Sequence, residues 1–135
     1  MPSKRFQGRY SSLEAISRFV SQAAQEAGFD SSQIYAIVLA VDEACTNIIE
    51  HAYGGEGQGE IQCSYEITDD GLRIELHDWG RDFNPDIVPE PDFDVPLEKL
   101  QTRGAGLYFM RNLMDEVHFQ FGGNDGNVLV MVKQK

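Results

Sequence analysis

The sequence has no long hydrophobic run and no apolar core near its start. The longest uninterrupted apolar run is Ala36–Val41, far short of the ~20 residues that a membrane-spanning helix needs. The first ten residues, MPSKRFQGRY, lack the apolar centre of a secretion signal. These absences argue against a membrane protein and predict a cytoplasmic one.

Positive charge is also scarce. The chain has 11 Lys and Arg residues against 22 Asp and Glu residues, which gives a net charge of −11. Such a surface repels nucleic acids and anionic membranes, so neither is expected as a partner. Any polyphosphate that binds must be neutralised locally, by a metal ion, by backbone amides or by the few nearby arginines.

Cysteine and histidine are too few and too scattered for a metal centre. Cys45 occupies an apolar position of a helical pattern and Cys63 an inward position of a strand pattern. Both are expected to be small core residues rather than disulfide partners or ligands. The three histidines, His51, His77 and His118, show no metal-ligand spacing with them.

The order of the predicted elements indicates the fold. Two amphipathic helices come first, each with the spacing of a capping box at its start and glycine at its end. The capping pairs are Ser11 with Glu14 and Asp30 with Gln33, and the stops are Gly28 and Gly54-Gly55. Alternation of apolar and polar residues then predicts a hairpin over 60–78 and a second hairpin over 117–132. Between them, the helical spacing of apolar residues predicts a helix over 105–115. We expect a single domain, residues 1–135, of the α+β class: a two-layer α/β sandwich whose mixed, mostly antiparallel sheet carries helices on one face.

Glu43 and Asn47 lie one turn apart on one face of the second predicted helix. A solvated polar face is the simpler interpretation of this pair alone. Asparagine is nevertheless a mediocre helix former without a local reason to stand there. An amide oxygen one turn from a carboxylate could bind Mg²⁺ while the carboxylate acts as a base.

Two further patterns are equally weak when taken singly. Asp78 ends a predicted strand and Gly80 follows two residues later. This pair fits a simple turn. It also fits a site in which the carboxylate accepts a hydrogen bond from the exocyclic amine of a flat base and the glycine lets that base approach the backbone. Gly104 and Gly106 precede a predicted helix, which fits a bare helix start or a phosphate cradle. No Walker motif or β-α-β unit surrounds these glycines.

Together, the three patterns are specific. The stretches Val41–Tyr53, Asp78–Pro85 and Arg103–Val117 give E-x-x-x-N, then D-x-G-x-x-F, then G-x-G-L after a long proline-rich and acidic segment. This arrangement resembles the GHKL ATP-binding superfamily, which includes gyrase B, histidine kinases and mismatch-repair ATPases. Within it the chain looks most like the small bacterial anti-sigma-factor serine/threonine kinases, and the resemblance covers nearly the whole chain.

The resemblance implies a role for each matching residue. Glu43 matches the general base, Asn47 the Mg²⁺ ligand, and Asp78 the carboxylate that pairs with the adenine amine, while Gly80 lies against the base. The segment 84–103 matches the lid that closes over the phosphates. The remaining expected nucleotide contacts are Phe83, Arg103, Gly104, Ala105, Gly106 and Leu107.

Two departures from the family pattern stand out. Relatives often carry Gly-Thr near the C-terminus, where the threonine helps to hold the adenine-side carboxylate; here the pair is Gly126-Asn127. The lid region is acidic, and its nearest bases in sequence are Arg81, Lys99 and Arg103. Arg103 is the expected lid cation.

The implied activity is ATP- and Mg²⁺-dependent phosphorylation of a serine or threonine. The implied partners are a sigma factor and a STAS-domain anti-anti-sigma protein, in a partner-switching circuit, and the implied assembly is a homodimer. An alternative is a nucleotide-gated regulatory binding module without kinase activity, which would have no need of Glu43. A sensor histidine kinase fragment is a poor fit, because no phosphoacceptor helix is apparent.

Overall fold

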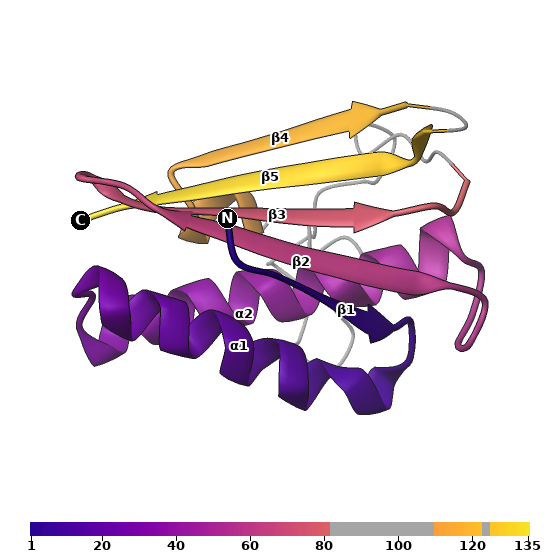
Figure 1. The fold of residues 1–135 in the computed structure, drawn as a ribbon, viewed down its shortest axis with the longest axis horizontal. Coiled ribbons are helices and arrows are strands. Elements are labelled where there is room, and N and C mark those ends of the chain that lie inside the picture. Colours follow the sequence, from indigo (N-terminus) through magenta and orange to yellow (C-terminus); the bar gives the residue numbers. More distant parts are fainter. Residues whose placement is uncertain (82–109, 123–124) are drawn as a thin grey trace, which may run out of the picture.

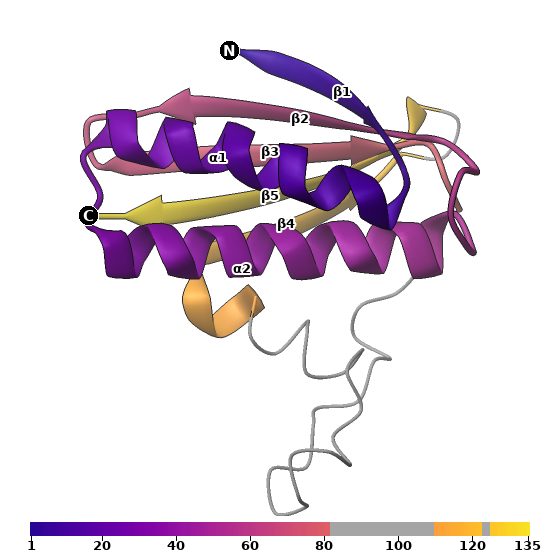
Figure 2. The same ribbon diagram turned by 90° about the horizontal axis from the view of Figure 1, so that it is seen from below.

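The computed structural model describes residues 1–81, 110–122 and 125–135. Its strands form one five-stranded sheet in the order β1-β2-β3-β5-β4, and α1 and α2 lie side by side on one face of it (Figures 1 and 2). The strands are β1 (Ser3–Gln7), β2 (Glu60–Ile67), β3 (Gly71–Asp78), β4 (Glu116–Phe121) and β5 (Asn127–Gln134). The helices are α1 (Leu13–Ala27) and α2 (Ser31–Asn47), with a 3-10 turn η1 (Tyr10–Ser12) before α1 and a π-helical turn η2 (Ile48–Ala52) after α2. The predicted two-layer α+β sandwich is confirmed, and every strand pair described is antiparallel.

The helix boundaries confirm one predicted capping box and reject the other. Asp30 and Gln33 form both hydrogen bonds of the box that opens α2, and Gly28 ends α1 with a φ of 93°. The predicted box of Ser11 with Glu14 is wrong, because α1 follows directly from the turn η1 and starts at Leu13. Its N-cap residue, Ser12, already has helical dihedrals and makes no side-chain cap, whereas a capping side chain needs an extended backbone.

The core fills the space between the sheet and the two helices. The predicted apolar stripes are buried there, including Ile16 and Val20 of α1 and Ile37 and Val41 of α2. Alternate residues of β3 face them: Leu72, Ile74 and Leu76.

Cys45 and Cys63 belong to this core, buried and unpaired with each other, as expected. Burial raises the pKa of the Cys63 thiol to about 12 and that of Cys45 well above its usual range. Thiolate chemistry is therefore suppressed at both.

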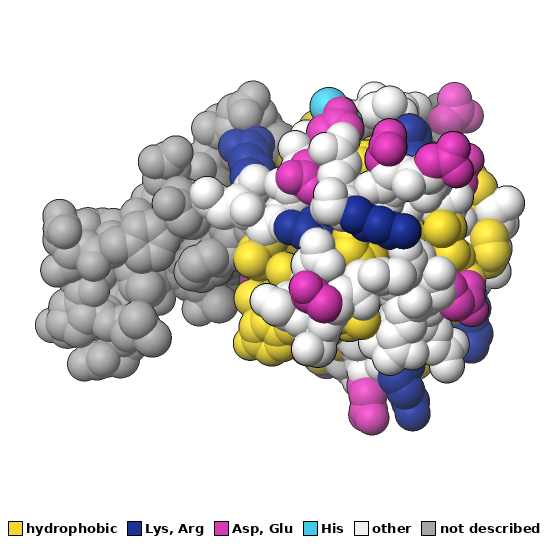
Figure 3. Space-filling view, turned by 90° about the vertical axis from the view of Figure 1, so that its left-hand side faces the viewer, with side chains coloured by type: hydrophobic (Ala, Val, Ile, Leu, Met, Phe, Trp, Pro, Cys, Tyr) yellow, Lys and Arg dark blue, Asp and Glu magenta, His cyan; other side chains and the backbone are white. Residues whose placement is uncertain are grey.

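The elements that carry Asn47, Asp78 and Asn127 converge at one end of the molecule. The end of α2, the end of β3 and the start of β5 lie together at one end (Figure 1). Figure 3 looks at the opposite end, where acidic and basic side chains are interspersed. Within the described ranges, no helix combines the length and apolarity needed to cross a membrane.

Candidate functional site

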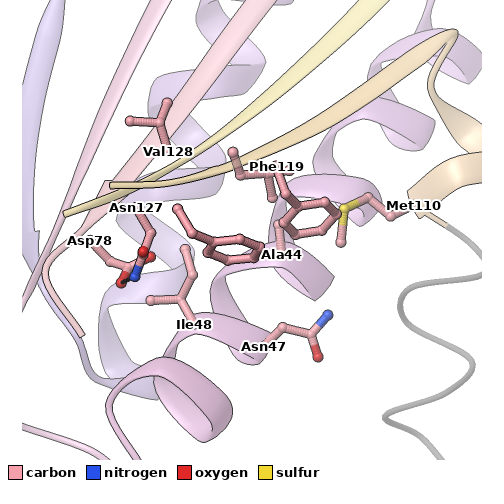
Figure 4. A pocket seen from close by; sticks show the side chains of 10 residues that line it. Ala44, Asn47, Ile48, Asp78, Met110, Phe119, Asn127 and Val128 are labelled. Carbon is pink, nitrogen blue, oxygen red and sulfur yellow. Dashed lines mark hydrogen bonds between the residues drawn. The ribbon is translucent and has the colours of Figure 1, made fainter. Parts of the chain in front are cut away.

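A pocket opens where α2 meets strands β3, β5 and β4. It contains about 300 Å³ of space that no atom fills, a volume that includes open solvent. Its apolar wall consists of Ala44, Ile48, Met110, Phe119 and Phe121, among others (Figure 4). Such a wall suits a flat hydrophobic group.

Three buried polar side chains line the same pocket. Asn47, Asp78 and Asn127 are each at most 4% exposed, and they are the full set of buried polar or charged residues in the parts of the chain that the structure describes. Buried polar groups cost free energy unless they are satisfied. Their concentration in one pocket therefore makes it the candidate binding site of the described residues.

Asp78 is held in place by its neighbours. Oδ1 accepts a hydrogen bond of 3.0 Å from the backbone N–H of Gly80 and one of 3.0 Å from Nδ2 of Asn127. Asn127 is the direct cross-strand partner of Asp78, so the register of β3 and β5 brings the two side chains to the same face. The departure from threonine at position 127 thus keeps the contact with the carboxylate, through an amide instead of a hydroxyl.

Gly80 is required by close packing against the end of the long helix. A Cβ atom at this position would lie 2.4 Å from the carbonyl oxygen of Ala52. The next residue, Arg81, donates its backbone N–H to that same carbonyl and its Nε to the carbonyl of His51, both at 2.8 Å. The chain leaving β3 is thereby fastened to η2. The expected contact of Gly80 with a bound base stays a prediction.

Asn47 is the last residue of α2 and the first neighbour of the π-helical turn η2. Such turns often occur at functional sites. One amide atom of Asn47, assigned as Nδ2, is buried and has no hydrogen-bond partner among the described residues. The assignment of amide oxygen and nitrogen follows from hydrogen bonding, and no described contact fixes it here. Asn47 can therefore turn its oxygen toward a ligand.

Glu43 lies one turn before Asn47 and is half-buried. Its pKa is raised above the ordinary value, first by burial and then by the negative charges of Asp42 and Glu50. A carboxylate with a raised pKa is a better proton acceptor. Glu43 is outside the pocket lining, beside Asn47 along the helix.

The other predicted nucleotide contacts lie outside the described residues: Phe83, Arg103, Gly104, Ala105, Gly106 and Leu107, together with the predicted lid 84–103. The predicted helix over 105–115 is described only from Met110, and it ends at residue 113. Met110 is fully buried and Leu113 packs against the core, as the apolar pattern predicts.

Known proteins resemble this chain over most of its length. The family described as the histidine kinase-like ATPase domain matches residues 6–133. Proteins named serine-protein kinase RsbW are 35% identical in Bacillus velezensis, 34% in Listeria monocytogenes and 36% in Halalkalibacterium halodurans. These matches cover 84%, 92% and 84% of this chain and 72%, 79% and 70% of the respective relatives.

Two solved structures share the fold. The RsbU and RsbW domains of a Mycobacterium tuberculosis protein match with a TM-score of 0.67 and 20% identity, over 99% of this chain and 32% of that one. The histidine kinase domain of a blue-light activated kinase from Erythrobacter litoralis matches with a TM-score of 0.53 and 18% identity, over 90% of this chain and 58% of that one. The family match, the identities above 30% and the shared fold agree with the geometry of the pocket, and the chain belongs to the histidine kinase-like ATPase domain family.

Proposed function

We propose that this chain is an ATP-dependent protein serine/threonine kinase that acts on a STAS-type antagonist and binds a sigma factor. The observation that carries the proposal is the convergence of Asn47, Asp78 and Asn127 in one pocket, one helical turn from the half-buried Glu43. The names of the relatives, serine-protein kinases, point to the same reaction.

The pocket holds the adenine of ATP. Asp78 accepts a hydrogen bond from the exocyclic amine, because a carboxylate offers about four acceptor positions and can take the amine in addition to donors such as Gly80 N–H and Asn127 Nδ2. The rings of Phe119 and Phe121, whose centroids are 6.0 Å apart, form part of the apolar wall against which the base packs. Aromatic walls favour such stacking.

Asn47 fits the expected Mg²⁺ site. The buried amide atom without a described partner is assigned as nitrogen, and exchanging the amide nitrogen and oxygen would place the oxygen there. An amide oxygen is a suitable ligand for this ion. No group of three or more His, Cys, Asp or Glu residues in the described ranges could hold a metal by itself. That fits a Mg²⁺ ion, which uses one or two protein ligands and completes its shell with phosphates and water. When bound, the ion supplies charge neutralisation at the phosphates.

Glu43 serves as the base for the incoming hydroxyl. Its raised pKa improves its ability to take the proton as the serine or threonine oxygen attacks the γ-phosphorus and ADP leaves with the bridging oxygen. The predicted lid, residues 84–103, would exclude water so that transfer to protein wins over hydrolysis. Arg103 is the proposed lid cation, and Gly104 and Gly106 supply backbone amides to the phosphates.

The proposed assembly is a homodimer that exchanges two partners. A sigma factor is bound in one state, and the STAS-domain anti-anti-sigma protein is the substrate in the other. The net charge of −11 disfavours direct action on nucleic acid.

The deciding experiment is transfer of labelled γ-phosphate from ATP to a purified STAS domain. A labelled STAS domain that loses its label when the acceptor serine or threonine is replaced supports the kinase. ATP binding with no transfer to any STAS domain supports the alternative, a nucleotide-gated binding module.

The pH dependence of the kinase gives a test of its base. Removing the charge of Glu50 by Glu50→Gln lowers the pKa of Glu43, because a like charge that opposes ionisation is gone. Deprotonated Glu43 is the active form, so the acid limb of the kcat/KM profile is expected to move to lower pH. The matched control is Glu66→Gln, an exposed acid on β2 that does not act on Glu43. An unchanged acid limb in Glu50→Gln contradicts the assignment of Glu43.

A further inference from the structure

Tyr53 follows the π-helical turn η2 and directs its hydroxyl to the end of β3. The backbone N–H of Trp79 donates a hydrogen bond to this hydroxyl at 3.0 Å, and the hydroxyl donates to the carbonyl oxygen of Glu60 at the start of β2. A tyrosine hydroxyl has one hydrogen to give and lone pairs that accept. Burial raises the pKa of this phenol above its ordinary value, so the hydroxyl keeps the proton that it donates.

Two glycines leave room for the ring of Tyr53. A Cβ atom on Gly59 would overlap with the ring and its hydroxyl oxygen, and one on Gly8 would lie 3.4 Å from the ring atom Cδ2. Neither glycine has a positive φ, so close packing against the ring, rather than a turn, explains the missing side chain at both positions. The ring is thereby held in one place, and the position of its hydroxyl follows.

The three backbone N–H groups that follow β3 have different acceptors. That of Gly80 reaches Oδ1 of Asp78 inside the same turn, and that of Arg81 reaches a backbone carbonyl of η2. Only that of Trp79 is received by a side chain from another element, the hydroxyl of Tyr53. The peptide unit between Asp78 and Trp79 is planar. This bond therefore fixes the plane that begins at the Cα atom from which the Asp78 carboxylate projects.

A purely structural account would make the hydroxyl a link between the start of β2 and the end of β3. These strand ends are already paired directly, with Ile61 opposite Asp78. The chain leaving β3 is also fastened to η2 by two hydrogen bonds from Arg81. The hydroxyl adds little to the attachment of these elements, and its particular effect falls on the one peptide unit beside the carboxylate.

We propose that Tyr53 is a positioning residue for nucleotide binding. Its hydroxyl holds the peptide unit after Asp78 and through it directs the carboxylate toward the adenine amine. Tyr53 is outside the pocket lining, so it acts through Asp78 and not by contact with the base. This inference rests on the proposed ATP binding and adds to it a residue that sets the geometry of the base contact.

The test removes only the hydroxyl. Tyr53→Phe keeps the ring between the two glycines and leaves the Trp79 N–H without its partner. Dissociation constants of the wild type and the variant are measured for ATP and for purine riboside triphosphate, which lacks the exocyclic amine. The affinity for ATP is expected to fall about three- to tenfold, the effect of one hydrogen bond. The affinity for purine riboside triphosphate should change by less than about twofold, because it makes no amine contact that could be lost.

Tyr65→Phe is the matched control. Tyr65 is on β2, and its ring packs edge-on against Phe19 of α1 with the centroids 5.2 Å apart. It is outside the pocket lining. The same loss of a hydroxyl there should leave both dissociation constants within about twofold of the wild-type values. Circular dichroism establishes that each variant is folded.

Amide hydrogen exchange locates the effect in the chain. The Trp79 N–H should exchange faster in Tyr53→Phe than in the wild type, because its acceptor is gone. The Arg81 N–H, which is bound to a backbone carbonyl, should keep its rate. An unchanged rate at Trp79, or an equal increase at both amides, contradicts a local action of the hydroxyl and overturns the inference.

The binding outcomes separate the inference from the proposed function. An equal loss of affinity for the two nucleotides in a folded Tyr53→Phe overturns the inference, because the hydroxyl would then support the pocket as a whole. An unchanged affinity for ATP overturns it as well, and so does equal wild-type affinity for the two nucleotides, which removes the amine contact. All three results leave ATP binding by the wild type intact. Failure of the wild type to bind ATP overturns both the inference and the proposed function.

Discussion

Replacing Glu43 by glutamine is expected to lower the rate of phosphoryl transfer by a factor of about 10²–10⁴, the usual contribution of a general base. Glutamine has nearly the same shape and cannot take the proton of the incoming hydroxyl. ATP binding should change little, because Glu43 is outside the lining of the pocket that holds the base. Single-turnover transfer to the STAS substrate and a separate ATP titration measure the two effects.

Stability provides the control for this variant. The folded-state pKa of Glu43 is raised above its ordinary value, so ionising it costs the folded state free energy at a pH above that pKa. Glu43→Gln is therefore expected to unfold at the same temperature or a higher one at neutral pH, with the difference disappearing in acid.

A distant acid serves as the matched comparison. Glu26 is exposed on α1 and has no assigned role in transfer. Glu26→Gln should retain the transfer rate. Parallel loss of ATP binding and transfer in Glu43→Gln would instead make Glu43 a binding residue.

The elements with a strong local pattern were predictable. The stripes of α1 and α2, the alternation of β2 and β3 and the capping box at Asp30 all appear as expected. Each depends on interactions between residues close in sequence, so periodicity and capping chemistry suffice to find them.

Two elements have no such local signal. β1 buries only Phe6 among its five residues, and Lys4 and Arg5 are charges of the kind that edge strands carry. Nothing in so short a pattern distinguishes it from a loop, and pairing with β2 alone defines it. The π-helical turn η2 has no local sequence signal either, because two of its carbonyls, those of His51 and Ala52, accept hydrogen bonds from Arg81, which is distant in sequence.

The candidate site, like the fold, could be predicted from the sequence only in part. The types and spacing of Glu43, Asn47 and Asp78 pointed to the chemistry, and the fold brings Asn47 and Asp78 to one pocket. The apolar wall from Phe119 and Phe121 was not foreseen, since two aromatic residues alternating in a strand predict only a core face. The contact of Asn127 with Asp78 depends on strand register, which pairs the two residues and which composition cannot reveal.

Asp78→Asn is expected to weaken ATP binding by a factor of about 30–1,000, or about 2–4 kcal/mol. The substitution replaces a charged acceptor by an amide. If the remaining oxygen keeps the donors Gly80 N–H and Asn127 Nδ2, the new amide nitrogen takes the other position. Two donors then face each other where the carboxylate met the adenine amine. Isothermal titration with ATP measures the loss.

The same geometry predicts a change of preference as well as a loss. Inosine triphosphate carries an oxygen in place of the amine, and that oxygen can accept from the new amide of Asp78→Asn. The ratio of ATP affinity to inosine triphosphate affinity should therefore fall in the variant, even if neither ligand binds tightly.

Asp78→Ala is the contrasting variant. It removes the acceptor altogether and leaves the Gly80 N–H and the Asn127 amide without their shared partner, so it should lower the unfolding temperature as well as ATP affinity. Asp78→Asn should remain close to the wild type in thermal unfolding. If Asp78→Asn keeps the wild-type preference for ATP over inosine triphosphate, the carboxylate organises the strand end without reading the base. Its contacts within the fold, among them the hydrogen bonds from Gly80 and Asn127, would then be its function.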